Sequence, residues 1–267
     1  MIPKYCLTEW RQQAPWIEDY QVEQDLIISR ALVSLYKNKK IKNSLVFRGG
    51  TALNKIYIKP AARYSEDIDL VQITPEPIGE ILNEIRHSLS WLGDPVRKLT
   101  ERSAKLFYRY PTNDNTKKKL KIEINTTEHF HIFDFVDHEF SVTNPWFTGK
   151  TELRTYQLNE LVGTKIRALY QRRKGRDLFD LWLVLKNNLI DIDMALKVFL
   201  AHCNKDKQNV TRALFEKNLH EKIKFDDFRH DILGLLSDNR EWSFEHAYDT
   251  VKDNLICLLP GEPWKSK

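Results

Sequence analysis

The chain has 267 residues, of which 42% are hydrophobic and 30% are charged, so it can bury a core and is neither disordered nor fibrous. No segment approaches the roughly 20 apolar residues that cross a bilayer, and the first residues lack a secretory apolar stretch, so we expect a cytoplasmic protein without a membrane anchor. Three widely separated cysteines argue against a disulfide framework and a thiolate zinc site.

The net charge of +5 is modest, but the bases are concentrated in two segments. Residues 97–121 contain nine lysines and arginines and two acids, and residues 165–176 contain six bases and no acid. Two interpretations are open. These segments are either solvated faces, or they contact a polyanion such as nucleotide phosphates or nucleic acid.

The first part of the chain alternates between helical and strand-like patterns. Apolar residues recur near the helical period over residues 22–36, and the apolar run at 45–47 predicts a strand. The pair Gly49-Gly50 then forms a turn before a helical pattern resumes at Thr51. We expect another strand at 68–73 and an amphipathic helix at 78–92.

The middle of the chain is aromatic and β-branched. Residues 106–110 and 120–126 predict two strands joined by a polar turn at 112–116, and strand-like sequence follows at 130–142.

After Pro145 the pattern becomes helical, at residues 158–173, at 177–186 and over most of the remainder. The predicted fold is therefore of the α+β or α/β class, a mixed sheet flanked by helices followed by a helical C-terminal half. We place the domains at residues 1–146 and 147–267.

Two acids open the strand at 68–73. Asp67 and Asp69 are two residues apart, so their carboxylates share one face of the strand while Ile68 points to the core. Two like charges this close repel each other unless a cation lies between them, and Mg²⁺ prefers such oxygen clusters. The pattern predicts a divalent metal site; the alternative is a solvated strand end with two unrelated acids.

A third acid, Glu123, lies in an alternating segment in which Ile122 and Ile124 point the other way. If this segment pairs with the strand that carries Asp67 and Asp69, Glu123 completes a site for two metal ions, as phosphoryl transfer requires. The alternative is an exposed strand acid beside Lys121.

The glycine pair and the acidic strand belong to two motifs that resemble those of the AbiEii/AbiGii nucleotidyltransferase toxins, found in abortive-infection and type IV toxin–antitoxin systems. These toxins belong to the DNA polymerase β-like nucleotidyltransferase superfamily. The first motif consists of Gly49, Gly50, Thr51, Leu53 and Lys55. The second consists of Arg63, Ser65, Asp67, Ile68, Asp69 and Leu70. A third motif is matched by Lys165, and a fourth, R-D-x-x-D, runs from Arg176 to Asp180.

The first two motifs have the residues of a nucleotide-binding site. Backbone N–H groups near Gly49 and Gly50, the Thr51 hydroxyl and Lys55 are expected to bind phosphates at the start of a helix. Arg63 suits the outer phosphate because its guanidinium is a planar fork. Ser65 shares the face of Asp67, which favours a phosphate or metal-water contact, and a turn-forming serine is the alternative.

The resemblance also suggests roles for the two later motifs. Lys165 is expected to neutralise the triphosphate or to act as a general acid on pyrophosphate. Asp180 is expected to orient Lys165 or to contact the base or ribose, whereas pairing with Arg176 one turn earlier is a structural alternative. For Asp177, pairing with Arg173 is the preferred interpretation.

Together these features imply an enzyme that uses Mg²⁺ or Mn²⁺ to transfer NMP from an NTP to an acceptor hydroxyl. The resemblance implies the 3′ end of tRNA, or another RNA, as acceptor, and a toxin controlled by a separately encoded antitoxin. Two alternatives remain open at the level of sequence. One is the same fold modifying a small molecule or a protein, and the other is a nucleotide-binding regulator without turnover.

Overall fold

The structure is a computed structural model that describes residues 2–113, 116–237 and 242–265. The described chain forms two compact units. The first comprises residues 2–129, residues 134–156 and a short segment at Leu236. The second comprises residues 130–133, 157–235 and 242–265.

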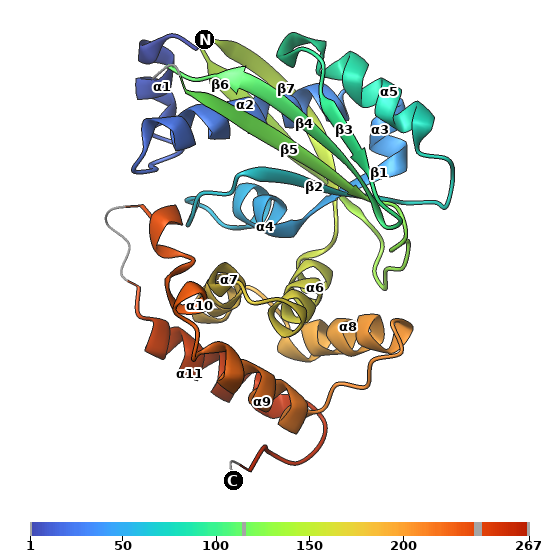
Figure 1. The fold of residues 1–267 in the computed structure, drawn as a ribbon, viewed down its shortest axis with the longest axis vertical. Coiled ribbons are helices and arrows are strands. Elements are labelled where there is room, and N and C mark those ends of the chain that lie inside the picture. Colours follow the sequence, from blue (N-terminus) through green and yellow to red (C-terminus); the bar gives the residue numbers. More distant parts are fainter. Residues whose placement is uncertain (1, 114–115, 238–241, 266–267) are drawn as a thin grey trace. The chain divides into compact units, whose positions relative to one another are not determined.

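A seven-stranded mixed sheet forms the body of the first unit (Figure 1). Its strands are β1 (Leu45–Arg48), β2 (Asp67–Gln72), β3 (Val96–Leu99), β4 (Ser103–Pro111), β5 (Lys117–Asn125), β6 (Val136–Asn144) and β7 (Phe147–Thr155). Their order across the sheet is β3-β4-β5-β2-β1-β7-β6. The pairs β2–β5 and β1–β7 are parallel, and the other neighbours are antiparallel.

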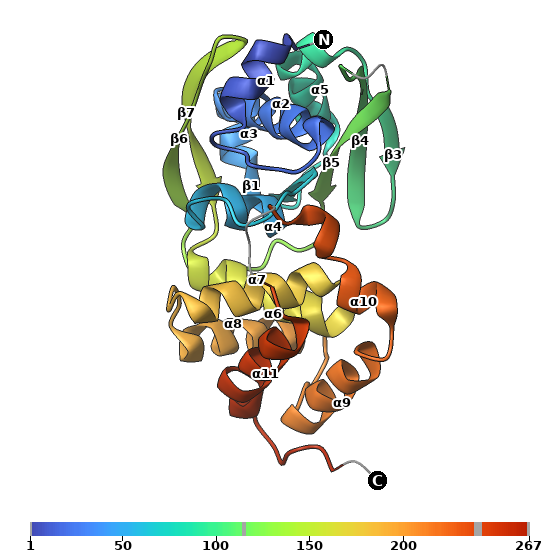
Figure 2. The ribbon, with the colours of Figure 1, turned by 90° about the vertical axis from the view of Figure 1, so that its left-hand side faces the viewer.

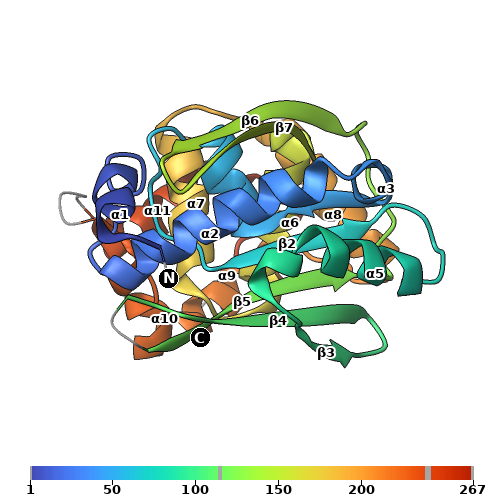
Figure 3. The same ribbon diagram turned by 90° about the horizontal axis from the view of Figure 1, so that it is seen from above.

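Helices cover one side of this sheet. They are α1 (Lys4–Trp10), α2 (Asp19–Tyr36), α3 (Lys39–Ser44) and α5 (Gly79–Ser88). The sheet curves around α2, which lies between the β6–β7 hairpin and the strands β3, β4 and β5 and packs against β6 and β7 (Figures 2 and 3). The short helix α4 (Gly49–Ala52) follows β1 and continues into a π-helical turn, Leu53–Tyr57.

The strands predicted at 45–47, 68–73, 106–110 and 120–126 are confirmed, and so is the helix at 22–36. The helix predicted at 78–92 is α5 followed by a 3₁₀ turn, Ser90–Leu92. Part of the turn predicted at 112–116 lies outside the described residues, since Asp114 and Asn115 are not described.

The prediction of strand from residue 130 is wrong at its beginning, because β6 starts at Val136. Residues 130–133 belong to the second unit, where the backbone N–H groups of Ile132 and Phe133 donate to the Glu160 carboxylate. These donors are therefore committed to a side chain rather than to a strand ladder.

Two strands were not predicted. All four residues of β3 are exposed, so its sequence shows no alternation of apolar and polar residues. Strand β7 pairs along its whole length with β6 and also touches β1, which makes it part of the first unit. The domain boundary that we place between residues 146 and 147 thus lies within the β6–β7 hairpin, whereas the compact units divide after Tyr156.

The second unit is helical, as predicted. Its helices are α6 (Leu158–Gln171), α7 (Gly175–Lys186), α8 (Ile192–Lys205), α9 (Arg212–Lys222), α10 (Asp226–His230) and α11 (Phe244–Asn254). Helix α6 packs against α7, α8 and α9, and α7 packs against α10 and α11. An aromatic cluster of Phe179, Trp182 and Trp242 supports the last of these contacts. None of the helices in the described ranges has the length and apolarity needed to span a bilayer.

Candidate active site

The register of three central strands brings the predicted acids to one face of the sheet. Asp69 lies opposite Arg48 of β1 on one side and opposite Glu123 of β5 on the other, and Asp67 lies opposite Lys121. Residues that face each other across paired strands project to the same side of the sheet. Asp67, Asp69 and Glu123 therefore share one half-exposed face, which we call the acidic face.

The opposite side of the same strands is apolar and buried. Ile68 and Leu70 of β2 and Ile122 and Ile124 of β5 are at most 1% exposed. A shift of either strand by one residue would bury the carboxylates and expose these apolar side chains, so core packing fixes the acidic face in place.

A lysine that the sequence analysis did not assign to the site lies between two of these acids. The Lys121 Nζ is 2.9 Å from Asp67 Oδ2 and 3.1 Å from Glu123 Oε2. A second lysine, Lys105 of β4, places its Nζ 2.9 Å from Glu123 Oε1. Within the described residues, no three His, Cys, Asp or Glu side chains are gathered closely enough to hold a metal ion. An ammonium group thus bridges acids that we predicted to share a metal.

Burial and these contacts shift the pKa values of the side chains on the acidic face. Burial, reinforced by the negative charge of Asp69, raises the pKa of Asp67 to about 6, although Lys121 acts in the opposite direction. Burial would also raise the pKa of Glu123, but the hydrogen bonds from Lys105 and Lys121 outweigh it and lower that pKa. The pKa of Lys121 is raised because its carboxylate partners outweigh the effect of burial. Of Asp67 and Glu123, Asp67 is therefore the carboxyl whose protonated form the site favours more.

The glycine pair lets the backbone approach the acidic strand. Gly49 has a φ of +81°, a conformation that side chains disfavour, and a Cβ there would lie 2.5 Å from Asp69 Oδ2. A Cβ on Gly50 would lie 2.3 Å from a terminal nitrogen of Arg63. Both glycines are thus required by close contacts with residues of the second motif, and the N-terminus of α4 begins beside Asp69.

Thr51 and Ser65 connect the two motifs. The Thr51 side chain is buried, and its hydroxyl lies 2.7 Å from Ser65 Oγ and also donates to the backbone carbonyl of Asp67. Ser65 is half-exposed. The Thr51 hydroxyl therefore fixes the start of β2 relative to α4, while Ser65 lies at the surface beside the acidic face.

Lys55 and Arg63 make contacts inside the protein. The Lys55 Nζ is 2.9 Å from Asp25 Oδ1 of α2 and 3.0 Å from Ser29 Oγ. Asp25 also accepts a hydrogen bond from the indole of Trp10. Arg63 is 2% exposed and donates to the carbonyl of Tyr64 at 3.0 Å. These two predicted phosphate ligands are held by contacts within the first unit and support its motif loops.

Lys165 and Asp180 belong to the second unit, where they form a buried ionic cluster. The Lys165 Nζ is 3.0 Å from Asp177 Oδ1 and 3.0 Å from Asp180 Oδ2, and both aspartate side chains are fully buried. Asp177 also pairs with Arg172 rather than with the predicted Arg173. Burial would raise the pKa of Asp177, but Lys165 and Arg172 outweigh it and hold this pKa far below its usual range. Of the roles open for Asp180, these contacts favour the orientation of Lys165.

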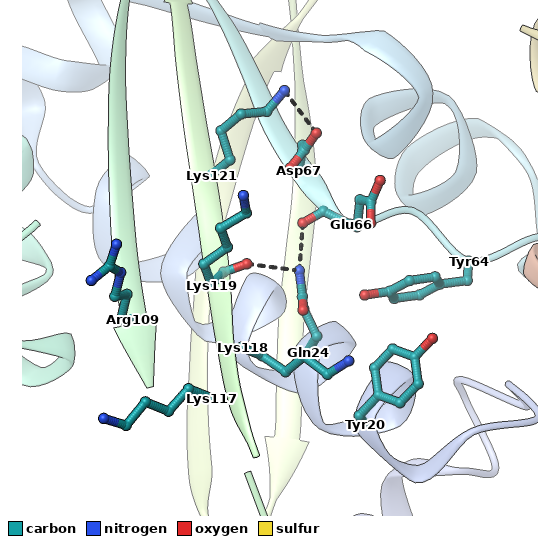
Figure 4. A pocket seen from close by; sticks show the side chains of 10 residues that line it. All are labelled: Tyr20, Gln24, Tyr64, Glu66, Asp67, Arg109, Lys117, Lys118, Lys119 and Lys121. Carbon is teal, nitrogen blue, oxygen red and sulfur yellow. Dashed lines mark hydrogen bonds and ion pairs between the residues drawn. The ribbon is translucent and has the colours of Figure 1, made fainter. Parts of the chain in front are cut away.

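A cavity of about 720 Å³ opens in the first unit beside Asp67 (Figure 4). Gln24 of α2 lies at its base and donates to the backbone carbonyls of Glu66 and Lys119, at 2.7 and 3.4 Å. The other lining residues are Tyr20, Tyr64, Glu66, Asp67, Arg109, Lys117, Lys118, Lys119 and Lys121. Five of the ten lining residues are cationic and two are acidic, so the cavity is basic except at Glu66 and Asp67.

Comparison with known proteins agrees with the motifs. A sequence model for a family described as "Nucleotidyl transferase AbiEii toxin, Type IV TA system" matches residues 30–250. The nucleotidyltransferase toxin MenT4 from Mycobacterium tuberculosis is similar in structure, with a TM-score of 0.66 at 16% identity, over 97% of this chain and 91% of that one. JHP933 from Helicobacter pylori is similar with a TM-score of 0.53 at 19% identity, over 90% of this chain and 92% of that one. At these identities the structural likeness shows the fold. In sequence, no curated protein matches the chain significantly.

Proposed function

The chain belongs to the AbiEii family of nucleotidyltransferase toxins of type IV toxin–antitoxin systems, and we propose that it transfers NMP from an NTP to the 3′-terminal hydroxyl of a tRNA in a metal-dependent reaction. The observation that carries this proposal is the acidic face, where Asp69 lies beside the start of α4 and opposite Glu123, and Asp67 lies two residues before Asp69 on the same side of β2. The tRNA acceptor follows from the family resemblance, and the cytoplasm is where both substrates occur.

The residues of the acidic face fit a divalent cation. Carboxylate oxygens are the ligands that Mg²⁺ and Mn²⁺ prefer, and Asp67, Asp69 and Glu123 present them on one side of two adjacent strands. The ammonium of Lys121 between Asp67 and Glu123 shows that this position already attracts positive charge. When bound, the metal would activate the attacking hydroxyl and neutralise charge on the phosphates.

The protein's own residues would position the donor nucleotide. The N–H groups at the start of α4 carry the partial positive charge of a helix N-terminus, and Gly49 and Gly50 add no side chain of their own to this turn. Ser65 lies at the surface next to this turn through its contact with Thr51. In the reaction, a bond forms between the acceptor oxygen and the α-phosphorus, and the bond from that phosphorus to pyrophosphate breaks.

Four of the predicted site residues would have a structural role and would not contact phosphate. They are Lys55, Arg63, Lys165 and Asp180. The Lys55 ammonium and the Lys165 ammonium each contact a buried carboxylate. Releasing either of them to a phosphate would take a cation away from a buried carboxylate, which is costly even though Trp10 still contacts Asp25 and Arg172 still contacts Asp177. We therefore propose that these residues orient the motif loops and the helices that carry them.

The proposal is tested by incubating the protein with Mg²⁺, labelled NTPs and total cellular RNA, followed by sequencing of RNA 3′ ends. We expect label on tRNA 3′ ends, no label with Asp69→Asn, and the loss of growth arrest in cells that express this variant. Circular dichroism of Asp69→Asn provides the folding control. Label only in protein or in small molecules would overturn the RNA acceptor, and continued toxicity of a folded Asp69→Asn variant would overturn the mechanism.

A further inference from the structure

Strand β5 presents a regular row of positive charge that leads to the acidic face. Lys117, Lys119 and Lys121 are separated by two residues each, so they project from the same side of the strand as Glu123. Arg109 of β4 lies opposite Lys119 and therefore joins this row. We call Arg109, Lys117, Lys119 and Lys121 the basic row.

The outer members of the basic row are available to a ligand. Arg109, Lys117 and Lys119 are exposed, and no ion pair with an acid of the described ranges involves them. Lys121, in contrast, is paired with Asp67. The outer residues of the row, Arg109, Lys117 and Lys119, thus carry positive charge without an acid of the described residues beside them, and only Lys121, next to the acidic face, is paired with an acid.

The row lines the cavity beside Asp67, and its opposite wall is aromatic. Figure 4 shows Arg109 and Lys117 on one side and Tyr20 and Tyr64 on the other. The Lys118 Nζ lies 3.7 Å from the centre of the Tyr20 ring and holds this wall against β5. Tyr64 is only 3% exposed, whereas Tyr20 is half-buried, so the aromatic surface open to the cavity is that of Tyr20. Cations along one wall and aromatic surface along the other are the features with which proteins bind unpaired nucleotides.

The spacing along the row suits a polynucleotide backbone. Alternate residues of a strand are about 6.6 Å apart, which is comparable to the separation of successive phosphates in an extended single strand. The cavity has the volume of a small-ligand site, which matches the room that a few unpaired nucleotides need.

The position of the row also separates it from the donor nucleotide. In the sheet, β5 and β4 lie on one side of β2, whereas β1 and the turn Gly49-Gly50 lie on the other. We propose that the basic row guides a single-stranded polynucleotide, with its 3′ end directed to Asp67, while the donor NTP binds on the β1 side. This inference rests on the proposed function, and it assigns the acceptor side of that site.

The test measures binding in EDTA, so that no turnover occurs. A short single-stranded RNA with a 5′-fluorescein label is titrated with protein at several KCl concentrations, and anisotropy gives Kd. Matched arms use DNA of the same sequence and the same RNA in a blunt duplex. The variant is Arg109→Gln/Lys119→Gln. The control is Lys39→Gln/Lys150→Gln, which removes two exposed lysines of α3 and β7 from the same unit.

If the basic row contacts two phosphates through Arg109 and Lys119, the slope of log K against log salt should decrease by about 1.4, because each contact on a single strand contributes about 0.7. The same loss should raise Kd by about tenfold or more at low salt, with less than about a twofold change in the control. Binding of DNA as tightly as RNA, or more weakly, agrees with the proposal. Equal loss in the variant and the control, or a duplex that binds as tightly as the single strand, would overturn it.

Failure of this inference is distinguishable from failure of the proposed function. If the wild-type protein labels RNA 3′ ends and Arg109→Gln/Lys119→Gln binds and labels RNA like the control, the function stands and the basic row has no part in it. If the wild-type protein labels no RNA but the variant still loses single-strand affinity, the row binds polynucleotide and the assigned reaction is wrong.

Discussion

Lys121 provides a direct test of whether a cation belongs on the acidic face. Its ammonium lies within 3.1 Å of both Asp67 and Glu123, so a divalent ion that binds these carboxylates must displace it or bind against its repulsion. Replacing this residue by methionine keeps the length of the side chain and removes the charge. We expect Lys121→Met to bind Mn²⁺ more tightly than the wild-type protein in the absence of nucleotide.

The size of this effect follows from the geometry. Two unit charges 4 Å apart interact with about 1 kcal/mol in water and more at lower dielectric. The side chains of Asp67 and Lys121 are 29% and 26% exposed, so the aqueous value is the appropriate lower limit. Removal of the repulsion should therefore increase Mn²⁺ affinity by about fivefold or more. Without metal, the same variant should lose about 1 kcal/mol of stability, as is typical of half-exposed ion pairs.

The assay is calorimetric titration with Mn²⁺ at pH 8, where Asp67 is ionised despite its raised pKa of about 6. Lys119→Met is the matched control, because Lys119 lies on the same side of β5 and has no carboxylate partner within the described residues. It should change Mn²⁺ affinity by less than about twofold. Unchanged or weaker Mn²⁺ binding by Lys121→Met would show that the ammonium does not occupy a cation position, and the metal assignment of this face would be refuted.

Three further predictions concern stability. The pKa of Asp67 is raised from 3.8 to about 6, so this group contributes stability that is fully present below about pH 3.8 and is lost as the pH rises through 6. Metal-free protein should therefore gain stability when the pH is lowered from 7.5 to 5. The variant Asp67→Asn should show a smaller gain in thermal melts. Gly50→Ala should lower the free energy of unfolding in urea by about 1–3 kcal/mol, because its Cβ would overlap a buried guanidinium, whereas Gly79→Ala, with no atom within 4 Å, should be tolerated. Lys165→Met should cost about 3–5 kcal/mol in the same measurement, since it removes the ammonium that lies 3.0 Å from two fully buried aspartates, and the exposed Lys174→Met should cost less than about 1 kcal/mol. A Lys165→Met variant as stable as Lys174→Met would contradict the buried cluster.

The arrangement of the acids could be predicted from sequence because it depends on local alternation. Asp67 and Asp69 flank Ile68, and Glu123 lies between Ile122 and Ile124, so burial of the isoleucines determines where the carboxylates point. The pairing of β2 with β5 was a condition of that prediction, and the structure satisfies it. The two-residue offset of Lys121 from Glu123 also indicates a shared face, so the same alternation places this lysine at the site.

Several contacts of the motif residues could not be predicted, because the partner comes from a distant part of the chain. Lys55 pairs with Asp25, which is 30 residues away on α2, and Lys105 reaches Glu123 only because β4 and β5 are antiparallel in this particular register. Spacing in sequence gives no information on such pairs. The sequence of a nucleotide-binding motif does not distinguish a lysine whose ammonium is free to contact phosphate from one whose ammonium pairs with a buried carboxylate. Lys55 is of the second kind.

The acidic face and the basic row depend on one and the same register. Leu120, Ile122 and Ile124 are fully buried, and the residues between and before them carry the lysines of the row and Glu123. A change that keeps the charges of β5 but shifts its pairing by one residue would point the side chains of both the acidic face and the basic row into the core. The position of these charged side chains therefore depends on core packing along β5 as well as on the charged residues themselves. A substitution such as Ile122→Thr, on the side of β5 opposite the acidic face, should loosen this register and so weaken Mn²⁺ binding in calorimetry and RNA binding in anisotropy together.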